Sequence, residues 1–484
     1  MRHMYPSYDI DLTREAARQC CDIAVRLLDD VGFRVPHPEF LSHLNGRSGI
    51  RIVGDRVHFD PALTERTLQE AIASWTPATP PSGPEKNRPW KARVAGVSMN
   101  VVDLETDEIR SATRQDLRDG IRLVESYGIE GNYPVMPQDL PPLMRAIACF
   151  KICYEMSDRI RPFDYQHPAQ TGYLCEMHRV MGKPFHVTLC VPTTLTIDAK
   201  DLDVFLKFYP EWKKRRDIQF SVLDYPMGGI TKPITVPGCA TMVLAETLAV
   251  HMLMNLFDPE LQMSVGFYGS LPTDMRNACW AFGSPRRHLF TWLNARLRPR
   301  LCGYEPEAYW QDMVLLETSS AAMDEHAAFE KMAQGLLGAL QGARSFYYAG
   351  SLCVDDLFGP VQFVMDLEMV EYIRQVIEAF APHPDIVSMD GLYEECRQVA
   401  LGNELFISTA NTASRFRNIH STSARIVREK LASWLSHRTT LKDRARQEAR
   451  ERIRTFQTRP LPGDKQLALD EIYSRAEREL STLA

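Results

Sequence analysis

The sequence has no excess of positive charge. Its 484 residues carry 56 Lys and Arg against 62 Asp and Glu, a formal net charge of −6. Binding to nucleic acid or to an anionic membrane relies on basic patches, which this balance disfavours. We therefore expect neither nucleic acid nor a membrane among the partners.

Disulfide chemistry is not indicated either. The eleven cysteines are an odd number without C-x-x-C spacing, which is typical of free thiols in a reducing compartment. The first residues, MRHMYPSYDIDLTREAARQC, are too charged for a secretory signal. The apolar run Ala240–Phe257 is interrupted by Glu246 and His251, which favours a buried helix over a membrane span. We expect a cytoplasmic protein.

Several catalytic motifs are missing. No G-x-G-x-x-G or P-loop follows a predicted strand, which weakens a nucleotide-binding open sheet, and no G-x-S-x-G elbow supports a Ser–His–Asp hydrolase. The 13 histidines include His167, His178 and His186, but they lack the His-x-Cys pattern with a distant Cys that a thiol-activating zinc needs. We therefore expect no metal site.

The first 90 residues have the pattern of a helical cap followed by a linker. Apolar residues recur at helical spacing over Leu12–Val31 with Thr13 as N-cap. Further helical patterns, PHPEFLSHL and PALTERTLQEAIAS, flank a strand pair, IRIVGDRVHF. The segment TPATPPSGPEKNRP is too rich in proline for regular structure. We place the N-terminal cap and linker at 1–90.

Residues 91–420 alternate between strand-like and helical patterns. This alternation implies parallel strands joined by right-handed crossovers. Seven or eight such units favour a closed TIM (β/α)8 barrel, an α/β fold of about 250 residues, over an open doubly wound sheet. The predicted strands are Tyr133–Met136, Arg161–Gln166, Phe185–Cys190, Ile218–Asp224, Gln262–Tyr268, Arg298–Gly303 and Ser345–Ala349.

The last segment, 421–484, is helical and densely charged. Its pattern is typical of a solvated helix with i,i+4 ion pairs, and we favour that interpretation over a docking surface. We treat it as a C-terminal helical extension of the barrel domain.

Aromatic and polar side chains follow several predicted strands. Reactive groups of a barrel lie at the carboxyl ends of its strands, so Tyr165, His167, Tyr225, Tyr268 and Tyr348 are expected at one mouth. Any single tyrosine is explained more simply by packing. Together they predict a cage for a quaternary ammonium, with cation–π attraction of about 0.5–2 kcal/mol per ring.

Two further positions are defined by their helical setting. Glu246 lies in an apolar helix after a Gly- and Pro-rich loop. A buried carboxylate must be paired or hydrogen-bonded, which favours a loop anchor slightly over a substrate contact. His326 and Glu330 are one helical turn apart, and a structural pairing is the default for both.

The segment RLLDDVGFRVPHPEFLSHL near the N-terminus, with further ordered blocks from about Leu12 to the C-terminus, resembles the trimethylamine methyltransferase family. The most specific block is YPMGGITKPITVPGCATMVLAETLAV, where Gly229, Thr231, Pro233, Thr235, Gly238, Ala245 and Glu246 follow the family pattern. The other blocks are RLLDDVGFRVPHPEFLSHL, VVDLETDEIRSATRQDL, DMRNACWAFGSPRRHL, MDLEMVEYIRQV and NTASRFR.

The likeness is to the branch without pyrrolysine, which demethylates quaternary amines such as glycine betaine. It implies a methyltransferase that moves a methyl group from a small quaternary amine to the Co(I) of a separate corrinoid protein. Cobalamin would then be bound by that partner, and no cofactor by this chain. Within this framework Glu246, Asp274 and His326 are candidate catalytic groups, and Arg276 or Arg415 would pair with a substrate carboxylate.

The sequence departs from the family pattern around the expected pocket. It has Thr318-Ser319-Ser320-Ala321 where the family often has Thr-Asp-Ser-Lys, His326 where an Asp-x-Gln segment ends, and Asn411 where a His is usual. Ser319, Ser320 and Asn411 are therefore candidate substrate contacts, and the quaternary amine is not assumed to be glycine betaine.

Two alternatives stay open. One is a barrel methyltransferase that acts on another one-carbon donor, such as a methylated pterin. The other is a protein that binds or senses a quaternary amine without turnover. The sequence also leaves the oligomeric state open, including a homo-oligomer.

Overall fold

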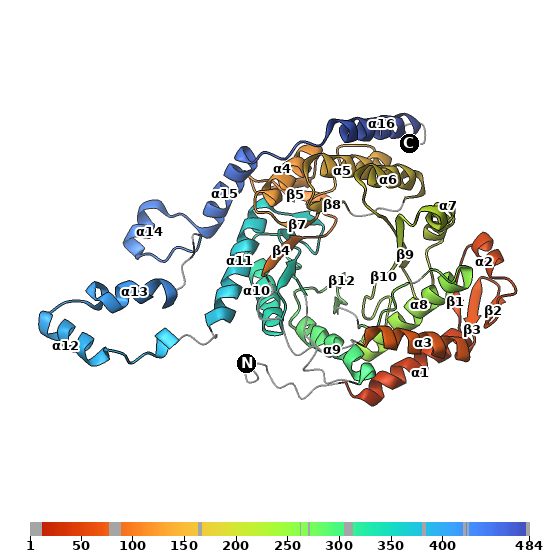
Figure 1. The fold of residues 1–484 in the computed structure, drawn as a ribbon, viewed down its shortest axis with the longest axis horizontal. Coiled ribbons are helices and arrows are strands. Elements are labelled where there is room, and N and C mark those ends of the chain that lie inside the picture. Colours follow the sequence, from red (N-terminus) through yellow and green to blue (C-terminus); the bar gives the residue numbers. More distant parts are fainter. Residues whose placement is uncertain are drawn as a thin grey trace.

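The computed structural model describes residues 12–76, 89–162, 167–261, 263–269, 272–303, 313–379, 384–419, 423 and 425–480. Most helices form a ring around the parallel strands, and a helical arm extends from one side of this ring (Figure 1). The predicted linker, at 77–88, lies outside the described residues. The domain boundaries at 90 and 420 stay predictions.

The N-terminal segment forms a small layer on the outside of the ring. It contains α1 (Arg14–Asp30), α2 (Pro38–Leu44), α3 (Pro61–Trp75) and an antiparallel sheet of β1 (Phe33–Arg34), β3 (Arg56–Phe59) and β2 (Ile50–Val53). Thr13 caps α1 as predicted, because its hydroxyl accepts the Ala16 N–H at 3.0 Å. The predicted strand pair is also confirmed. This layer packs on helices α8 and α9 of the ring.

The ring is built from strands that are each followed by a helix, so the predicted α/β class is confirmed. One parallel sheet has the order β13-β14-β4-β7-β8, and a second contains β10 and β9. The strands are β4 (Lys91–Val94), β7 (Glu130–Asn132), β8 (Ile160–Arg161), β9 (Phe185–Val191), β10 (Ile218–Asp224), β13 (Met313–Leu315) and β14 (Ser345–Tyr347). The helices are α4 (Arg114–Glu125), α5 (Pro142–Met156), α6 (Pro168–Met181), α7 (Ala199–Arg215), α8 (Val236–Phe257), α9 (Pro285–Cys302), α10 (Glu325–Leu340) and α11 (Pro360–Ala379).

Three predicted strands are wrong. Tyr133–Met136 follows β7 as a loop, and residues 263–268 belong to no strand. Arg298–Gly303 lies at the end of α9, where its alternating polar and apolar residues suggested a strand. The helix prevails because it begins at the Ser284 N-cap, buries Leu293 and Leu297 one turn apart, and ends only at left-handed Gly303.

Helix α8 is the core of the ring. Most of its side chains are buried, and a helix that is apolar on all sides belongs in a protein core or a membrane. Among the described helices it alone has the length and hydropathy of a membrane span, and 72% of that window is buried inside the fold. Its burial is that of a core helix, as predicted for Ala240–Phe257.

Short antiparallel pairs follow some of the parallel strands. A four-stranded sheet has the order β15-β16-β5-β6, from Ser351–Leu352, Leu357–Phe358, Asn100–Val102 and Ile109–Ser111. A hairpin of β11 (Thr273–Asp274) and β12 (Cys279–Trp280) precedes α9. Since β5 comes after β4 and β15 after β14, the four-stranded sheet is connected to the carboxyl ends of neighbouring strands.

The C-terminal helices divide between the ring and the arm. Helix α15 (Leu441–Thr455) packs on α11 and α4, and α16 (Gly463–Leu480) packs on α5 and α6. Helices α12 (Leu392–Gly402), α13 (Ala410–Ile419) and α14 (Leu431–His437) form the arm (Figure 1). The segment is helical, as predicted, but α15 buries Ala445 and Ala449 against the ring and is solvated only on its other face.

Candidate active site at the carboxyl ends of the strands

A buried charged triad lies at the end of β10. The Lys232 Nζ atom is 2.9 Å from Asp224 Oδ1 and 2.5 Å from Glu246 Oε2, and all three side chains have no solvent exposure. Buried charges are tolerated when they are paired in this way. Burial, with the nearby Asp224 carboxylate, raises the pKa of Glu246 above its ordinary value.

This triad fixes two loops at the strand ends. Lys232 belongs to the loop between β10 and α8. The other Glu246 oxygen, Oε1, accepts the Leu195 N–H at 2.7 Å in the loop after β9, where Leu195 has a φ of 48°. The contacts of Glu246 are therefore those of a loop anchor.

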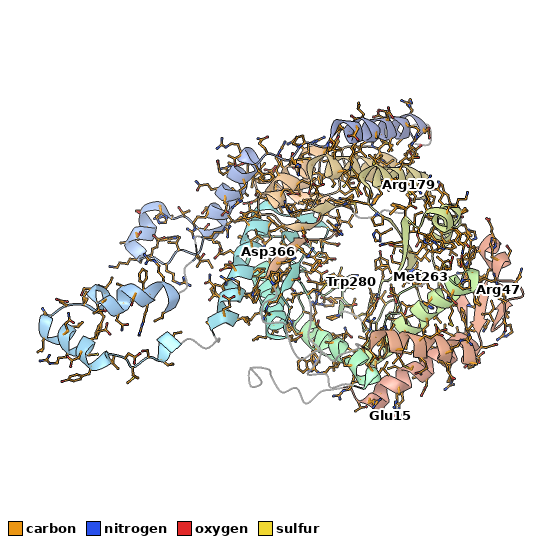
Figure 2. All side chains as sticks on the ribbon, in the orientation of Figure 1. Glu15, Arg47, Arg179, Met263, Trp280 and Asp366 are labelled. Carbon is orange, nitrogen blue, oxygen red and sulfur yellow. The ribbon has the colours of Figure 1, made fainter. Side chains whose placement is uncertain are left out.

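A second buried network lies at the ends of β13 and β14. Arg287 pairs with Glu317 at 2.7 Å, and Lys331 pairs with Asp366 at 2.6 Å. Asp366, which is labelled in Figure 2, also accepts the Gly350 N–H at 2.7 Å. Burial raises the pKa of Glu317. This network holds the segments that follow both strands against α9, α10 and α11.

Glu330 organises the Thr318–Ser320 segment. Its carboxylate accepts the Thr318 hydroxyl at 2.6 Å and the Ser319 N–H at 2.7 Å, and it lies 3.0 Å from His326 Nε2. The predicted pairing of His326 with Glu330 is thus present. The Ser320 hydroxyl donates to Asp324 at 2.9 Å, just beyond the segment, whereas Ser319 is exposed.

Gly283 allows Glu330 to take this position. A Cβ atom at residue 283 would stand 1.8 Å from the Glu330 side chain, so no other residue fits without moving the carboxylate. The GSP sequence at the start of α9 therefore has a packing role: it lets the backbone approach Glu330 closely.

One predicted tyrosine, Tyr348, lies beside a carboxylate that sequence reasoning missed. A second, Tyr225, is 45% exposed and lies within electrostatic reach of it. Asp355 follows β14, and both it and the Tyr348 ring lie against Gly96 after β4. Burial raises the pKa of Tyr348 and of Tyr225. Neighbouring acidic groups raise both pKa values further: Glu317 and then Asp355 at Tyr348, and Cys190, Asp201 and last Asp355 at Tyr225. Burial also raises the pKa of Asp355 itself. An acidic pair, Asp355-Asp356, shortly after a predicted strand was the available sequence signal.

Tyr268 lies deeper, in a cavity of about 600 Å³ between α9, α10 and the adjoining strands. Burial is the main cause that raises its pKa, and the Asp224 carboxylate raises it further. The cavity wall also includes Arg287, His288, Arg298 and Tyr347. Tyr268 therefore faces a space large enough for a small ligand.

One aromatic pair near these strand ends was also missed. Trp280 of β12 stacks on Phe282 with ring centroids 4.9 Å apart. In Figure 2 the labelled Trp280 lies within the outline of the helical ring. Tryptophan is the best aromatic partner for a cation, so Trp280 joins the candidates for substrate binding.

The remaining candidates lie elsewhere. Tyr165 is outside the described residues. His167 is an exposed N-cap of α6 that accepts the Ala169 N–H. Asp274 and Arg276 pair with each other at 2.6 Å on the β11–β12 hairpin, where the Arg276 side chain is 86% exposed.

Asn411 and Arg415 are on α13 of the arm. Asn411 donates to Glu395 at 2.7 Å, and the positive charge of Arg415 helps to lower the pKa of the same carboxyl, after the hydrogen bonds from Thr409 and Asn411. In the described ranges, no group of three or more His, Cys, Asp or Glu side chains is placed to hold a metal ion.

The ordered sequence blocks are matched by a known protein family over nearly the whole chain. Residues 1–481 match the family described as Trimethylamine methyltransferase (MTTB). The chain belongs to the trimethylamine methyltransferase family. The resemblance inferred from the sequence blocks is thereby confirmed.

Curated members of the trimethylamine methyltransferase family are similar to this chain at low identity. Trimethylamine methyltransferase MttB2 of Methanosarcina mazei is 23% identical over 320 residues, which are 65% of this chain and 60% of that protein. MttB of Methanosarcina thermophila is 26% identical over 223 residues, 45% of this chain and 42% of that protein. The chain thus spans about half the length of the curated relatives it matches.

Proposed function

We propose that the chain is a methyltransferase that moves a methyl group from a small, betaine-like quaternary amine to the Co(I) of a separate corrinoid protein. Membership of the trimethylamine methyltransferase family supports methyl transfer. One structural observation supports the choice of substrate: the Tyr348 ring and the partly buried Asp355 lie together against Gly96, and the 45% exposed Tyr225 at the end of β10 lies within electrostatic reach of the same carboxylate. Aromatic faces with a carboxylate form a site for a cation that carries no N–H donor.

The electrostatics of Asp355 favour a cationic ligand. Burial disfavours the ionised form of a carboxyl, and a positive charge beside the carboxyl offsets that free-energy cost. A bound quaternary ammonium would stabilise the ionised form of Asp355, and the carboxylate would in turn stabilise the ligand. A tyrosine hydroxyl has an ordinary pKa of about 10, and burial raises the pKa further at both positions, so the two rings are neutral aromatic faces at neutral pH.

The chemistry needs few groups from the chain. The C–N bond breaks with its electron pair on nitrogen, which leaves as a neutral tertiary amine and needs no proton. The corrinoid of the partner supplies the nucleophile that accepts the methyl group. The residues of this chain hold the cation, exclude water and aim one methyl along the line of displacement. The loops anchored by Glu246 and Glu330 would keep this geometry.

We further propose that the strands close into a TIM (β/α)8 barrel. The pairing of β14 with β4 joins the last parallel strand to the first. Residues 263–269 lie between α8 and α9, where the sixth of eight barrel strands is expected in chain order. In such a barrel the strand ends meet at one mouth. All eleven cysteines are free thiols, which supports a cytoplasmic location.

A methylation assay tests the function. Purified chain is mixed with Co(I)-cobalamin and, in turn, glycine betaine, carnitine and choline, and the loss of Co(I) absorbance is followed. We expect loss with at least one amine, and a decrease of about 10–100-fold in kcat/KM for Asp355→Asn, since two opposite charges about 4 Å apart near a protein surface attract each other by up to about 4 kcal/mol before screening. No methylation with any amine would contradict the proposal, and tight binding without turnover would favour a sensing protein.

A further inference from the structure

The cavity beside Tyr268 runs along one side of α9. On this helix its wall extends from Arg287 to Pro299, which is about 18 Å at about 1.5 Å per residue. The wall also includes both ends of β13, Met313 and Leu315. Its volume of about 600 Å³ is typical of sites for organic ligands. The cavity therefore has room for an elongated small molecule and is too large for a bare inorganic ion.

The charges around this cavity favour an anion. Among the described residues that line it there is no aspartate or glutamate, whereas Arg287 and Arg298 both belong to the wall. Glu317, which is not part of the wall, pairs with Arg287 at 2.7 Å and offsets its charge. The pKa of His288 is lowered, first by burial and then by the Arg287 charge. A quaternary ammonium would be repelled by the same positive charges.

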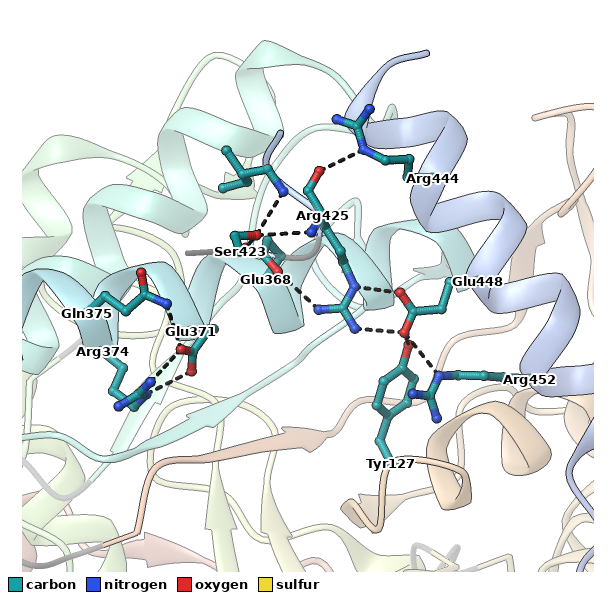
Figure 3. Close-up of polar contacts among 11 residues, drawn as sticks. Tyr127, Glu368, Glu371, Arg374, Gln375, Ser423, Arg425, Arg444, Glu448 and Arg452 are labelled. Carbon is teal, nitrogen blue, oxygen red and sulfur yellow. Dashed lines mark hydrogen bonds and ion pairs between the residues drawn. The ribbon is translucent and has the colours of Figure 1, made fainter. Parts of the chain in front are cut away.

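Arg298 is the cation that is available to such an anion. Its guanidinium donates to the Val265 carbonyl at 3.1 Å and lies 4.8 Å from the centre of the Trp75 ring, and both of these partners are uncharged. Arg425, in contrast, donates to the Glu448 carboxylate at 2.7 and 2.8 Å (Figure 3). Since a guanidinium has five N–H donors, Arg298 can form a bidentate contact with a carboxylate.

Gln334 supplies an unpaired hydrogen-bond acceptor in the same wall. The residue is 4% exposed. Its amide nitrogen donates to the carbonyls of Glu317 at 2.5 Å and of Glu330 at 3.2 Å, which fixes the orientation of the amide. The Oε1 atom is buried and has no hydrogen-bond partner among the described residues. A buried acceptor left unpaired is unfavourable, so a ligand with a donor group would be stabilised beside it.

We propose that this cavity binds a small hydroxy acid, whose carboxylate pairs with Arg298 and whose hydroxyl group donates to Gln334. A hydroxyl suits this position better than an ammonium group, which the guanidinium groups would repel. The hydroxy acid is a different ligand from the proposed methyl donor. Glycine betaine has a carboxylate but no O–H or N–H donor, and its cation is attracted to Asp355. Binding of the hydroxy acid does not depend on methyl transfer.

Calorimetric titration of the full-length protein tests this site. The probes are 4-hydroxybutanoate, 5-hydroxypentanoate and 6-hydroxyhexanoate, which differ in the spacing of their two groups. Each is compared with its hydroxy amide, which lacks the charge, and with its alkanoate, which lacks the hydroxyl. For at least one acid we expect the amide to bind about 10-fold more weakly or worse, and the alkanoate about 2–10-fold more weakly.

Variants of α9 show whether Arg298 holds the carboxylate. Arg298→Met should weaken binding of the acid by about 10-fold or more and abolish the preference for the acid over the amide. Arg298→Lys keeps the charge and should keep that preference. Arg286→Met, at an exposed arginine of the same helix outside the cavity wall, is the matched control and should bind as the wild type does. The comparison of ligands on the wild-type protein remains decisive if Arg298→Met does not fold.

Glycine betaine separates the two ligands. Arg298→Met should leave the affinity for glycine betaine unchanged, because its cation is expected beside Asp355. Loss of glycine betaine binding in this variant would assign the carboxylate contact to the methyl donor and overturn the proposal of a separate ligand. Absence of binding by all three hydroxy acids would also overturn the proposal. So would equal affinities for an acid, its amide and its alkanoate, or an effect of Arg286→Met as large as that of Arg298→Met.

Discussion

The strand-end site and the arm differ in which side chains are buried and which are exposed to water. At the site, charged side chains such as Lys232, Glu246 and Lys331 are withdrawn from water and paired with one another. In the arm, apolar side chains such as Ile407 and Leu405 are left in water. Burying charge restricts the geometry of a site, whereas exposing apolar surface creates a demand for a partner. The comparison shows that the strand ends pair their buried charges within the chain, whereas the arm leaves its apolar side chains exposed.

The largest effect should come from Lys232→Met. Removing the cation leaves the Asp224 carboxylate buried without a counter-charge and takes the Lys232 contact away from Glu246, and breaking such a buried pair costs about 3–5 kcal/mol. We expect a clear fall in the urea midpoint and loss of methyl transfer. If Lys232→Met unfolds at the wild-type midpoint, the triad does not stabilise the strand ends and the contrast with the arm fails.

Gly283→Ala should have an intermediate effect. The added methyl collides with Glu330, and forcing extra volume into a packed site costs about 1–3 kcal/mol. The Thr318–Ser319 segment would lose its acceptor, so we expect a higher KM for the amine. The control is Gly172→Ala in α6, where the nearest contact is Lys207 Nζ at 3.9 Å. This substitution should stabilise the helix by up to about 1 kcal/mol. An equal KM for Gly283→Ala and Gly172→Ala would show that the position of Glu330 does not affect binding of the amine.

Glu246→Gln should reveal the raised pKa of this carboxyl through the pH dependence of stability. The folded state binds the Glu246 proton more tightly than the unfolded chain does. This contribution is therefore complete below the ordinary carboxyl pKa of about 4.3 and is lost as pH rises towards the raised value. Relative to Glu246→Gln, the wild-type urea midpoint should decrease from about pH 5 upward. A difference that increases with pH would show that Lys232 holds the Glu246 pKa down instead.

Arg276→Met should have the smallest effect on stability. Its ion pair with Asp274 is exposed, and such pairs contribute about 0–1 kcal/mol. We expect an unchanged urea midpoint. A rise in KM for glycine betaine, with choline unaffected, would show that Arg276 contacts a substrate carboxylate and would extend the site onto the β11–β12 hairpin.

The sequence predicted those elements in which local pattern and tertiary packing agree. Phe185–Val191 and Ile218–Asp224 are apolar runs bounded by polar residues, and both are paired strands. Arg298–Gly303 was mistaken for a strand because a short alternating stretch carries less information than the i,i+4 burial of Leu293 and Leu297 before it.

The site was predicted only in part. Tyr225 and Tyr348 directly follow β10 and β14, as that rule predicted, whereas Tyr268 lies in a segment that belongs to no strand. Their role in substrate binding stays a prediction. Asp355 and Trp280 lie on short antiparallel elements or turns after the parallel strands, which have no periodicity of their own. The arm was missed for another reason: an apolar helical face has the same sequence pattern whether it is buried within its own chain or exposed.

The most direct test of the central claim replaces the positively charged nitrogen of the ligand with a neutral carbon. Calorimetric titration with glycine betaine and with 3,3-dimethylbutanoate, in which carbon replaces the charged nitrogen, isolates the contribution of the positive charge. We predict that the wild-type chain binds glycine betaine at least about 10-fold more tightly, equivalent to about 1.4 kcal/mol, and that Asp355→Asn abolishes most of this preference. Equal affinity for the two ligands, or a preference unchanged in Asp355→Asn, would contradict a cation site built from Tyr225, Tyr348 and Asp355.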